Sequence, residues 1–172
     1  MTQEQERTLN ALKTAIQMEI DGKEFYQNAA KASGNETGKK LLSKLAEEED
    51  IHRKVFENIY KTLSASKGWP EQPVHVSEVK TILSDLKKQP QKDFKAIKEE
   101  IDAVQTAIGL ETKTFDFYLE QAKKATYPAE KDYFESLALQ EHEHHKVLLS
   151  YFEFLKDPGA WYVQAEHPSL DG

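Results

Sequence analysis

The chain has 172 residues, a formal net charge of −7 at neutral pH and no cysteine. The length suits one domain with a substantial core, and the acidic balance argues against nucleic acid as a partner. The absence of cysteine excludes disulfides, thiolate metal sites and cysteine nucleophiles. No apolar run approaches the roughly 18 residues of a membrane span and the polar start lacks signal-peptide character, so we expect a cytoplasmic protein without a membrane segment.

The hydrophobic pattern predicts two long helical hairpins. The first pairs residues from about 4 to 32 with residues from about 36 to 66, and turns at Gly34 and its neighbours. The second pairs residues from about 92 to 125 with residues from about 129 to 156, and turns just before Pro128. These segments predict an all-α fold.

Residues 68–92 join the two hairpins. Gly68 and Pro70 stop any long helix there, and an apolar pattern behind Ser77 predicts one short helix with a serine cap. The segment is long enough to run the length of the hairpins, so we interpret it as the single long crossover of a four-helix bundle. The sequence thus predicts a bundle over residues 1–156.

A C-terminal tail is expected over residues 157–172. Asp157-Pro158-Gly159 ends the last bundle helix, and the aromatic pair Trp161 and Tyr162 is expected to pack on the bundle or on a second subunit. We expect a homodimer. The tail is too short and broken for the fifth helix of cage-forming ferritins, which counts against iron storage.

A Glu-x-x-His motif lies in the second predicted helix. Glu49 and His52 are three residues apart, so they share one helix face, and they continue the three-four spacing of Leu42, Leu45 and Phe56. Both therefore occupy core positions, where unpaired polar groups are costly. A divalent metal would remove this cost, although the two side chains could also simply hydrogen-bond to each other.

The motif recurs 92 residues later as Glu141 and His144, again at core positions of an apolar seam. The same offset relates Glu19 to Glu111, so the chain is a duplicated helical hairpin. Chance is a poor explanation for this repetition.

Turn geometry predicts that these residues meet. Glu19 and Glu49 each lie fifteen residues from Gly34, which puts both about 22 Å below the turn at 1.5 Å per residue. Glu111 and Glu141 are likewise equidistant from Thr126. Pairing the hairpins collects four carboxylates and two imidazoles in one layer of the bundle.

One Glu from each of two helices and a Glu-x-x-His from each of two others is the ligand set of ferritin-like di-iron and di-manganese carboxylate proteins. The sequence resembles the rubrerythrin-like branch of that superfamily over residues from about 5 to 156. The resemblance implies a ferritin-like bundle with two iron ions, or manganese or zinc. The implied metal ligands are Glu19, Glu49, His52, Glu111, Glu141 and His144.

Tyr26 and Tyr118 follow Glu19 and Glu111 by seven residues and suit the tyrosine that rubrerythrins place beside a ligand carboxylate. Thr114 departs from the family pattern, because rubrerythrins carry an additional glutamate at that position. The cysteine-rich rubredoxin domain that usually accompanies them is also missing from this sequence.

The resemblance implies a non-haem di-iron oxidoreductase that reduces hydrogen peroxide or O2. Without cysteine the chain cannot hold an iron–sulfur relay, so a separate rubredoxin-like donor protein is expected to supply electrons. The alternative is a non-catalytic or ferroxidase-like role in iron binding and handling. Substrate hydroxylation is a third interpretation, which requires an apolar cavity.

Other ligand-type residues are assigned elsewhere. The acidic run that includes Glu47 and Glu48 is expected to form a solvated face, and His75 is expected to be a loop residue. His142 and His145 flank the second motif but fall off the seam, so both are expected at the surface.

Overall fold

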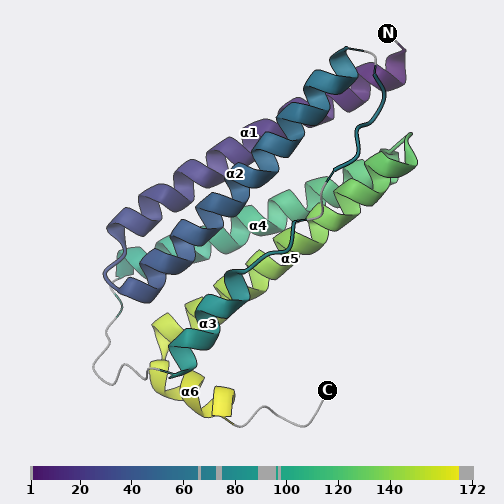
Figure 1. Ribbon diagram of the computed structural model, residues 1–172. Coiled ribbons are helices and arrows are strands. Elements are labelled where there is room, and N and C mark those ends of the chain that lie inside the picture. Colours follow the sequence, from purple (N-terminus) through teal and green to yellow (C-terminus); the bar gives the residue numbers. More distant parts are fainter. Residues whose placement is uncertain (1, 66, 73–74, 89–95, 97, 167–172) are drawn as a thin grey trace.

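The computed structural model describes residues 2–65, 67–72, 75–88, 96 and 98–166. Its helices are α1 (Gln3–Ala32), α2 (Glu36–Ser64), α3 (Val79–Lys88), α4 (Lys98–Lys124), α5 (Pro128–Lys156) and α6 (Pro158–Glu166). The four long helices lie side by side as two hairpins, α1 with α2 and α4 with α5 (Figure 1). The predicted all-α, ferritin-like bundle is therefore confirmed. None of the described helices is both long and apolar enough to cross a lipid bilayer.

Capping residues define the first hairpin. Thr2 and Gln5 form a reciprocal capping box at the start of α1, and the Asn35 side chain accepts a hydrogen bond from the Gly38 amide at the start of α2. Only three residues separate α1 from α2, which forces the two helices to run antiparallel.

The core consists of two apolar clusters along the bundle axis. One contains Leu41, Leu45 and Leu148 near the α1–α2 turn, and the other contains Leu12, Phe56 and Phe134 toward the opposite end. On every long helix the predicted ligand residues fall between the members of these two clusters. The polar layer is therefore closed above and below by packed apolar side chains.

Two buried carboxylates join the hairpins at the bundle ends. Glu100 of α4 accepts hydrogen bonds from Ser33 Oγ at 2.6 Å and from Asn35 Nδ2 at 3.0 Å, at the α1–α2 turn. At the other end Glu130 of α5 accepts one from Thr8 Oγ of α1 at 3.1 Å. These contacts fix the axial register of one hairpin against the other, and so the heights of the residues in the polar layer.

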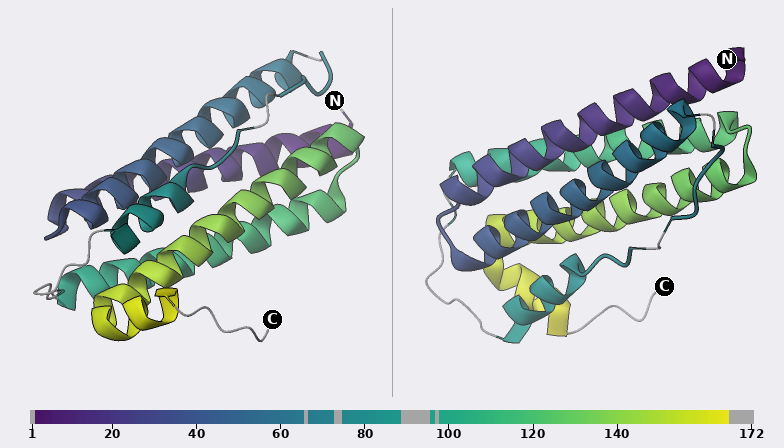
Figure 2. Two further views of the ribbon diagram at one scale, coloured as in Figure 1. Left: turned by 60° about the horizontal axis from the view of Figure 1, so that its bottom comes forward. Right: turned by 45° about the horizontal axis from the view of Figure 1, so that its top comes forward.

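The crossover runs along the bundle beside α2 and α5, and carries α3 (Figure 2). It begins at Gly68, whose φ of 76° favours glycine. The short helix expected behind Ser77 is present as α3. The third long helix was expected to begin at about residue 92, which is too early. Ala96 is not helical but packs on the apolar cluster near the α1–α2 turn, and α4 begins at Lys98. Residues 89–95 and 97 lie outside the described residues.

The segment after α5 forms a helix where a broken tail was expected. The Asp157 side chain accepts a hydrogen bond from the Ala160 amide at 2.9 Å, and Pro158 has the φ that a first helical residue needs. Trp161 is buried against Phe154, and its Nε1 donates to Ser150 Oγ of α5 at 3.1 Å. Residues 167–172 of the predicted tail lie outside the described residues.

Candidate metal centre

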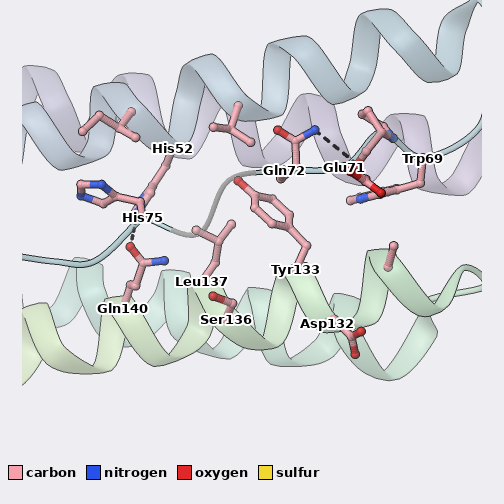
Figure 3. A pocket seen from close by; sticks show the side chains of 14 residues that line it. His52, Trp69, Glu71, Gln72, His75, Asp132, Tyr133, Ser136, Leu137 and Gln140 are labelled. Carbon is pink, nitrogen blue, oxygen red and sulfur yellow. Dashed lines mark hydrogen bonds between the residues drawn. The ribbon is translucent and has the colours of Figure 1, made fainter.

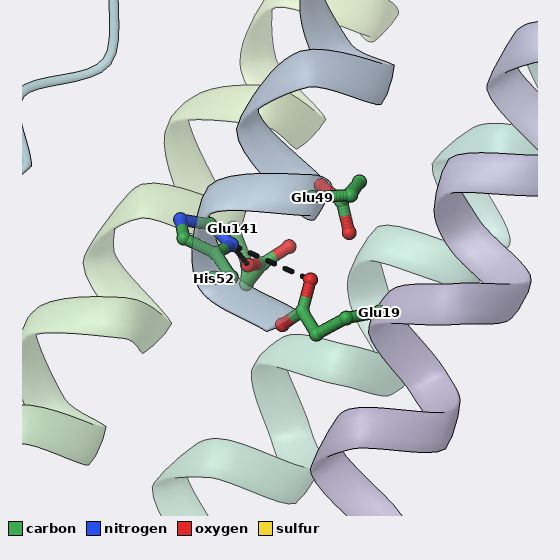
Figure 4. A group of neighbouring side chains, drawn as sticks. All are labelled: Glu19, Glu49, His52 and Glu141. Atoms are coloured by element: carbon green, nitrogen blue, oxygen red, sulfur yellow. Dashed lines mark ion pairs between the residues drawn. The ribbon is translucent and has the colours of Figure 1, made fainter. Parts of the chain in front are cut away.

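The four long helices bring all six predicted ligand residues into one buried layer. Glu19 comes from α1 and Glu111 from α4, whereas α2 and α5 each supply a Glu-x-x-His. All six residues are buried, with at most 4% of their surface exposed. Figure 4 shows four of them, with His52 directed at Glu141 and Glu19.

The six side chains form two overlapping groups, in each of which the possible ligand atoms lie within 4.8 Å of one another. In the first group, His52 Nδ1 lies 3.2 Å from Glu141 Oε1 and 3.5 Å from Glu19 Oε2. Glu49 completes this group. The possible ligand atoms of this group come from three helices, so they meet only in the assembled bundle.

The second group contains Glu49, Glu111, Glu141 and His144. His144 Nδ1 lies 3.3 Å from Glu49 Oε1 and 3.6 Å from Glu111 Oε2. Glu49 and Glu141 belong to both groups, and each group has one further carboxylate and one histidine of its own. This arrangement suits two neighbouring ions that share two carboxylates.

The inward-facing atoms lack hydrogen-bond partners within the described part of the chain. They are Glu19 Oε2, Glu49 Oε1, His52 Nδ1, Glu111 Oε2, both oxygens of Glu141, and His144 Nδ1. A buried polar atom without a hydrogen bond costs about 1–3 kcal/mol, and metal coordination would remove that cost. Four carboxylates balance two divalent ions, and oxygen with imidazole nitrogen suits iron, manganese or zinc. The residues therefore fit a two-metal centre.

Without metal, two of the crowded carboxylates are shifted toward their protonated form, whereas the histidines, outweighing burial, lower the pKa of Glu141. Burial and the neighbouring Glu141 raise the pKa of Glu111 to about 8, and burial, Glu141 and Glu19 raise the pKa of Glu49 well above its ordinary value. Burial alone would lower the pKa of His52, but Glu19 and Glu141 raise it well above 6.5. The metal-free layer is thus partly neutralised by protons in place of cations.

The two predicted tyrosines each bond a carboxylate of the other hairpin. The Tyr26 hydroxyl of α1 donates to Glu111 Oε1 of α4, and the Tyr118 hydroxyl of α4 donates to Glu19 Oε1 of α1. Burial, and then the bonded carboxylate, raises the pKa of each phenol well above 10, so both stay protonated donors. The contacts hold one oxygen of each carboxylate while the other oxygen faces the cluster.

The outer nitrogens of the two histidines are also bonded. His144 Nε2 lies 2.8 Å from Glu48 Oε2, and His52 Nε2 lies 3.1 Å from Gln140 Oε1. Such contacts fix the tautomer and leave Nδ1 free to bind metal. The expectation that Glu48 lies on a solvated face is wrong: it is completely buried, because the crossover covers it and the Glu78 amide donates to its Oε1 at 3.0 Å. The repeat offset pairs Glu48 with Gln140, but this equivalence does not indicate that Glu48 is buried.

The remaining histidines stay outside the cluster. His142 is exposed and His145 is half-buried, and neither belongs to the two groups of possible ligands found among the described residues. His75 lies in the crossover with its ring 6.5 Å from that of His52. It is a loop residue, as expected, but it faces His52, one of the predicted ligands.

Two cavities reach the layer from opposite sides. One, of about 220 Å³, lies between α2, α5 and the crossover, and Figure 3 shows Trp69 at one end with His52 and His75 at the other. It touches the outer edge of His52 but none of the cluster carboxylates. The second, of about 270 Å³, lies between α1 and α4 and is lined by Gly22, Glu49 and Glu111. Among the cavities described, only this second one offers a small molecule contact with carboxylates of the predicted ligand set.

Fold and site together define a ferritin-like four-helix protein with a buried carboxylate and histidine cluster suited to metal. The family model described as Rubrerythrin matches residues 10–150 and, separately, residues 102–167. The chain belongs to the rubrerythrin family. The second match begins 92 residues after the first, the offset that relates the two hairpins. Neither a curated protein nor a solved structure matches the chain.

Proposed function

We propose that the chain is a two-iron oxidoreductase that reduces hydrogen peroxide, or O2, with electrons from a separate donor protein. The observation that carries the proposal is the pair of four-residue groups sharing Glu49 and Glu141. Glu49 and Glu141 would be shared by two neighbouring ions, which would let one small oxidant react with both.

When bound, a pair of ferrous ions supplies the two electrons that hydrogen peroxide takes up with two protons as its O–O bond breaks to give water. Neighbouring residues of the chain hold the side chains of the proposed ligands in position. Tyr26 and Tyr118 restrain one oxygen of Glu111 and of Glu19, and the partners of His52 and His144 direct each Nδ1 inward. The apolar clusters on both sides keep water from the rest of the layer.

The cavity between α1 and α4 supports a small oxidant as the substrate. It reaches Glu49 and Glu111 directly, and Gly22 and Thr114 line it with little side-chain volume. A Cβ atom at Gly22 would stand 3.0 Å from Glu49 Oε2. Thr114 lines this cavity at the position where rubrerythrins carry an additional glutamate.

The electron source must be external to these residues. The chain has no cysteine to bind an iron–sulfur centre, so the electrons for repeated turnover would have to come from another molecule. A rubredoxin-like protein is the proposed donor.

Metal content is the first test, and the two groups allow a sharp design. Reconstituted protein is expected to hold about two ferrous ions per chain. Glu19→Ala should weaken only the first group and Glu111→Ala only the second, whereas Glu49→Ala with Glu141→Ala removes the shared ligands and should abolish binding. His142→Ala is the matched control, because that residue is exposed. Full metal in the double variant would refute the site.

Turnover is the second test. Ferrous protein mixed anaerobically with excess peroxide should oxidise once, followed by optical absorption, and should turn over only when rubredoxin and its reductase are added. Oxidation that never turns over with any donor, while iron accumulates beyond about two ions per chain, would instead identify iron handling as the function.

A further inference from the structure

The residues that precede the two Glu-x-x-His motifs occupy equivalent places in the repeat but differ in chemistry. Glu48 and Gln140 each lie one residue before a ligand glutamate and are 92 residues apart. Each contacts the outer nitrogen of the histidine on the opposite hairpin, at 2.8 Å for Glu48 and 3.1 Å for Gln140. The duplicated fold therefore supports one histidine with a carboxylate and the other with an amide.

Both oxygens of Glu48 are in use. Oε2 faces His144 Nε2, and Oε1 accepts the Glu78 amide at the start of the crossover helix. The Glu48 side chain is a carboxylate held between the His144 ring and a backbone amide, two groups that stabilise its charged form. Gln140 is neutral and only half-buried.

This difference acts on metal binding through two physical effects. A histidine that donates its outer N–H to a carboxylate is a more basic ligand at its other nitrogen than one that donates to an amide. The buried charge of Glu48 also adds to the carboxylates of the second group, whereas Gln140 adds no charge to the first. Both effects favour a cation at the second group.

We propose that Glu48 and Gln140 make the two ion positions unequal, so that the position formed by Glu49, Glu111, Glu141 and His144 fills first and holds its ion more tightly. Glu48 is thus a positioning residue that acts through His144. The proposal rests on the two-ion site of the proposed function, but not on peroxide reduction.

The experiment uses Zn²⁺, which has no redox chemistry to complicate the readout. Full-length protein is crystallised with one equivalent of Zn²⁺, and anomalous diffraction gives the occupancy at the two positions. Competition with a chelator in solution gives the two dissociation constants. The wild-type chain is expected to show most of the zinc beside His144 and two constants that differ by about 10-fold or more.

Exchanging the two residues should reverse the order. Glu48→Gln is expected to weaken the tighter site by about 10- to 100-fold, and Gln140→Glu to strengthen the weaker one. The double exchange should move the first zinc ion to the side of His52. Glu47→Gln is the matched control, because it removes an exposed charge from the same turn of α2 without touching a histidine.

Equal occupancy in the wild-type chain, or a site preference that the double exchange leaves unmoved, would overturn the proposal. If Glu47→Gln weakened zinc binding as much as Glu48→Gln, the effect would come from net charge alone, and the proposed role of the Glu48–His144 contact would be overturned. Glu48→Gln could disturb the crossover by weakening its hydrogen bond from the Glu78 amide. Gln140→Glu leaves that bond intact, so its effect on the weaker site tests the proposal independently. Failure to bind any zinc would instead refute the two-ion site itself.

Discussion

Replacing Gly22 by alanine should stabilise the metal-free protein and weaken metal binding at the same time. Gly22 lies inside α1 opposite Glu49, and an added Cβ would stand 3.0 Å from Oε2 and 3.6 Å from Cδ and Cγ of that side chain. Such a contact forces the carboxylate to move by a few tenths of an ångström. Gly109, exposed inside α4, has no atom within 4 Å of the same added carbon and is the matched control.

Helix propensity sets the size of the first effect. Alanine is favoured over glycine inside a helix by about 1 kcal/mol, which corresponds to about 2–4 °C in Tm for a chain of this size. Gly109→Ala should show that gain with or without metal. Gly22→Ala should show it only without metal, when Glu49 is free to turn, because bound ions would fix Glu49 as a ligand of both groups.

The assay is thermal unfolding of both variants with a chelator and with excess Zn²⁺, followed by circular dichroism. We expect Gly22→Ala to lose at least about tenfold in zinc affinity, which reduces the metal-dependent stabilisation by about 1.4 kcal/mol. A Tm gain for Gly22→Ala that is equal in both conditions, and equal to that of Gly109→Ala, would refute the steric coupling between α1 and the cluster.

Three further outcomes are expected. The metal-free protein should lose stability as the pH rises from about 5 to above 8, measured by denaturant unfolding. The pKa of Glu111 is about 8 in the folded chain against an ordinary 4.5, so over this range the native state holds a proton that the unfolded chain releases. Zinc affinity should rise over the same range, because zinc must displace that proton. Gly38→Ala should lower Tm without changing metal content by elemental analysis, because its Cβ would clash with the Tyr151 hydroxyl. Trp161→Ala should cost about 3 kcal/mol in urea unfolding, since it empties a buried contact with Phe154, while leaving zinc affinity unchanged.

The long helices and the site residues could be predicted because the sequence repeats a periodic pattern. A helix that buries one face must place its inward residues three and four apart, and Glu49, His52, Glu141 and His144 fall on those positions. Equal distances from a turn then put residues of adjacent helices at the same height, which the cluster geometry matches. The predicted metal roles await the binding experiments.

Tertiary structure alone decided which side chains meet across the hairpins. Tyr26 bonds Glu111 and Tyr118 bonds Glu19, although each tyrosine shares a helix with the other glutamate. Glu48 is buried because a crossover segment about thirty residues later in the chain covers it. Periodicity reports which face of a helix is apolar, but a polar residue beside that face is buried or exposed according to what packs there, and this depends on contacts between segments distant in sequence.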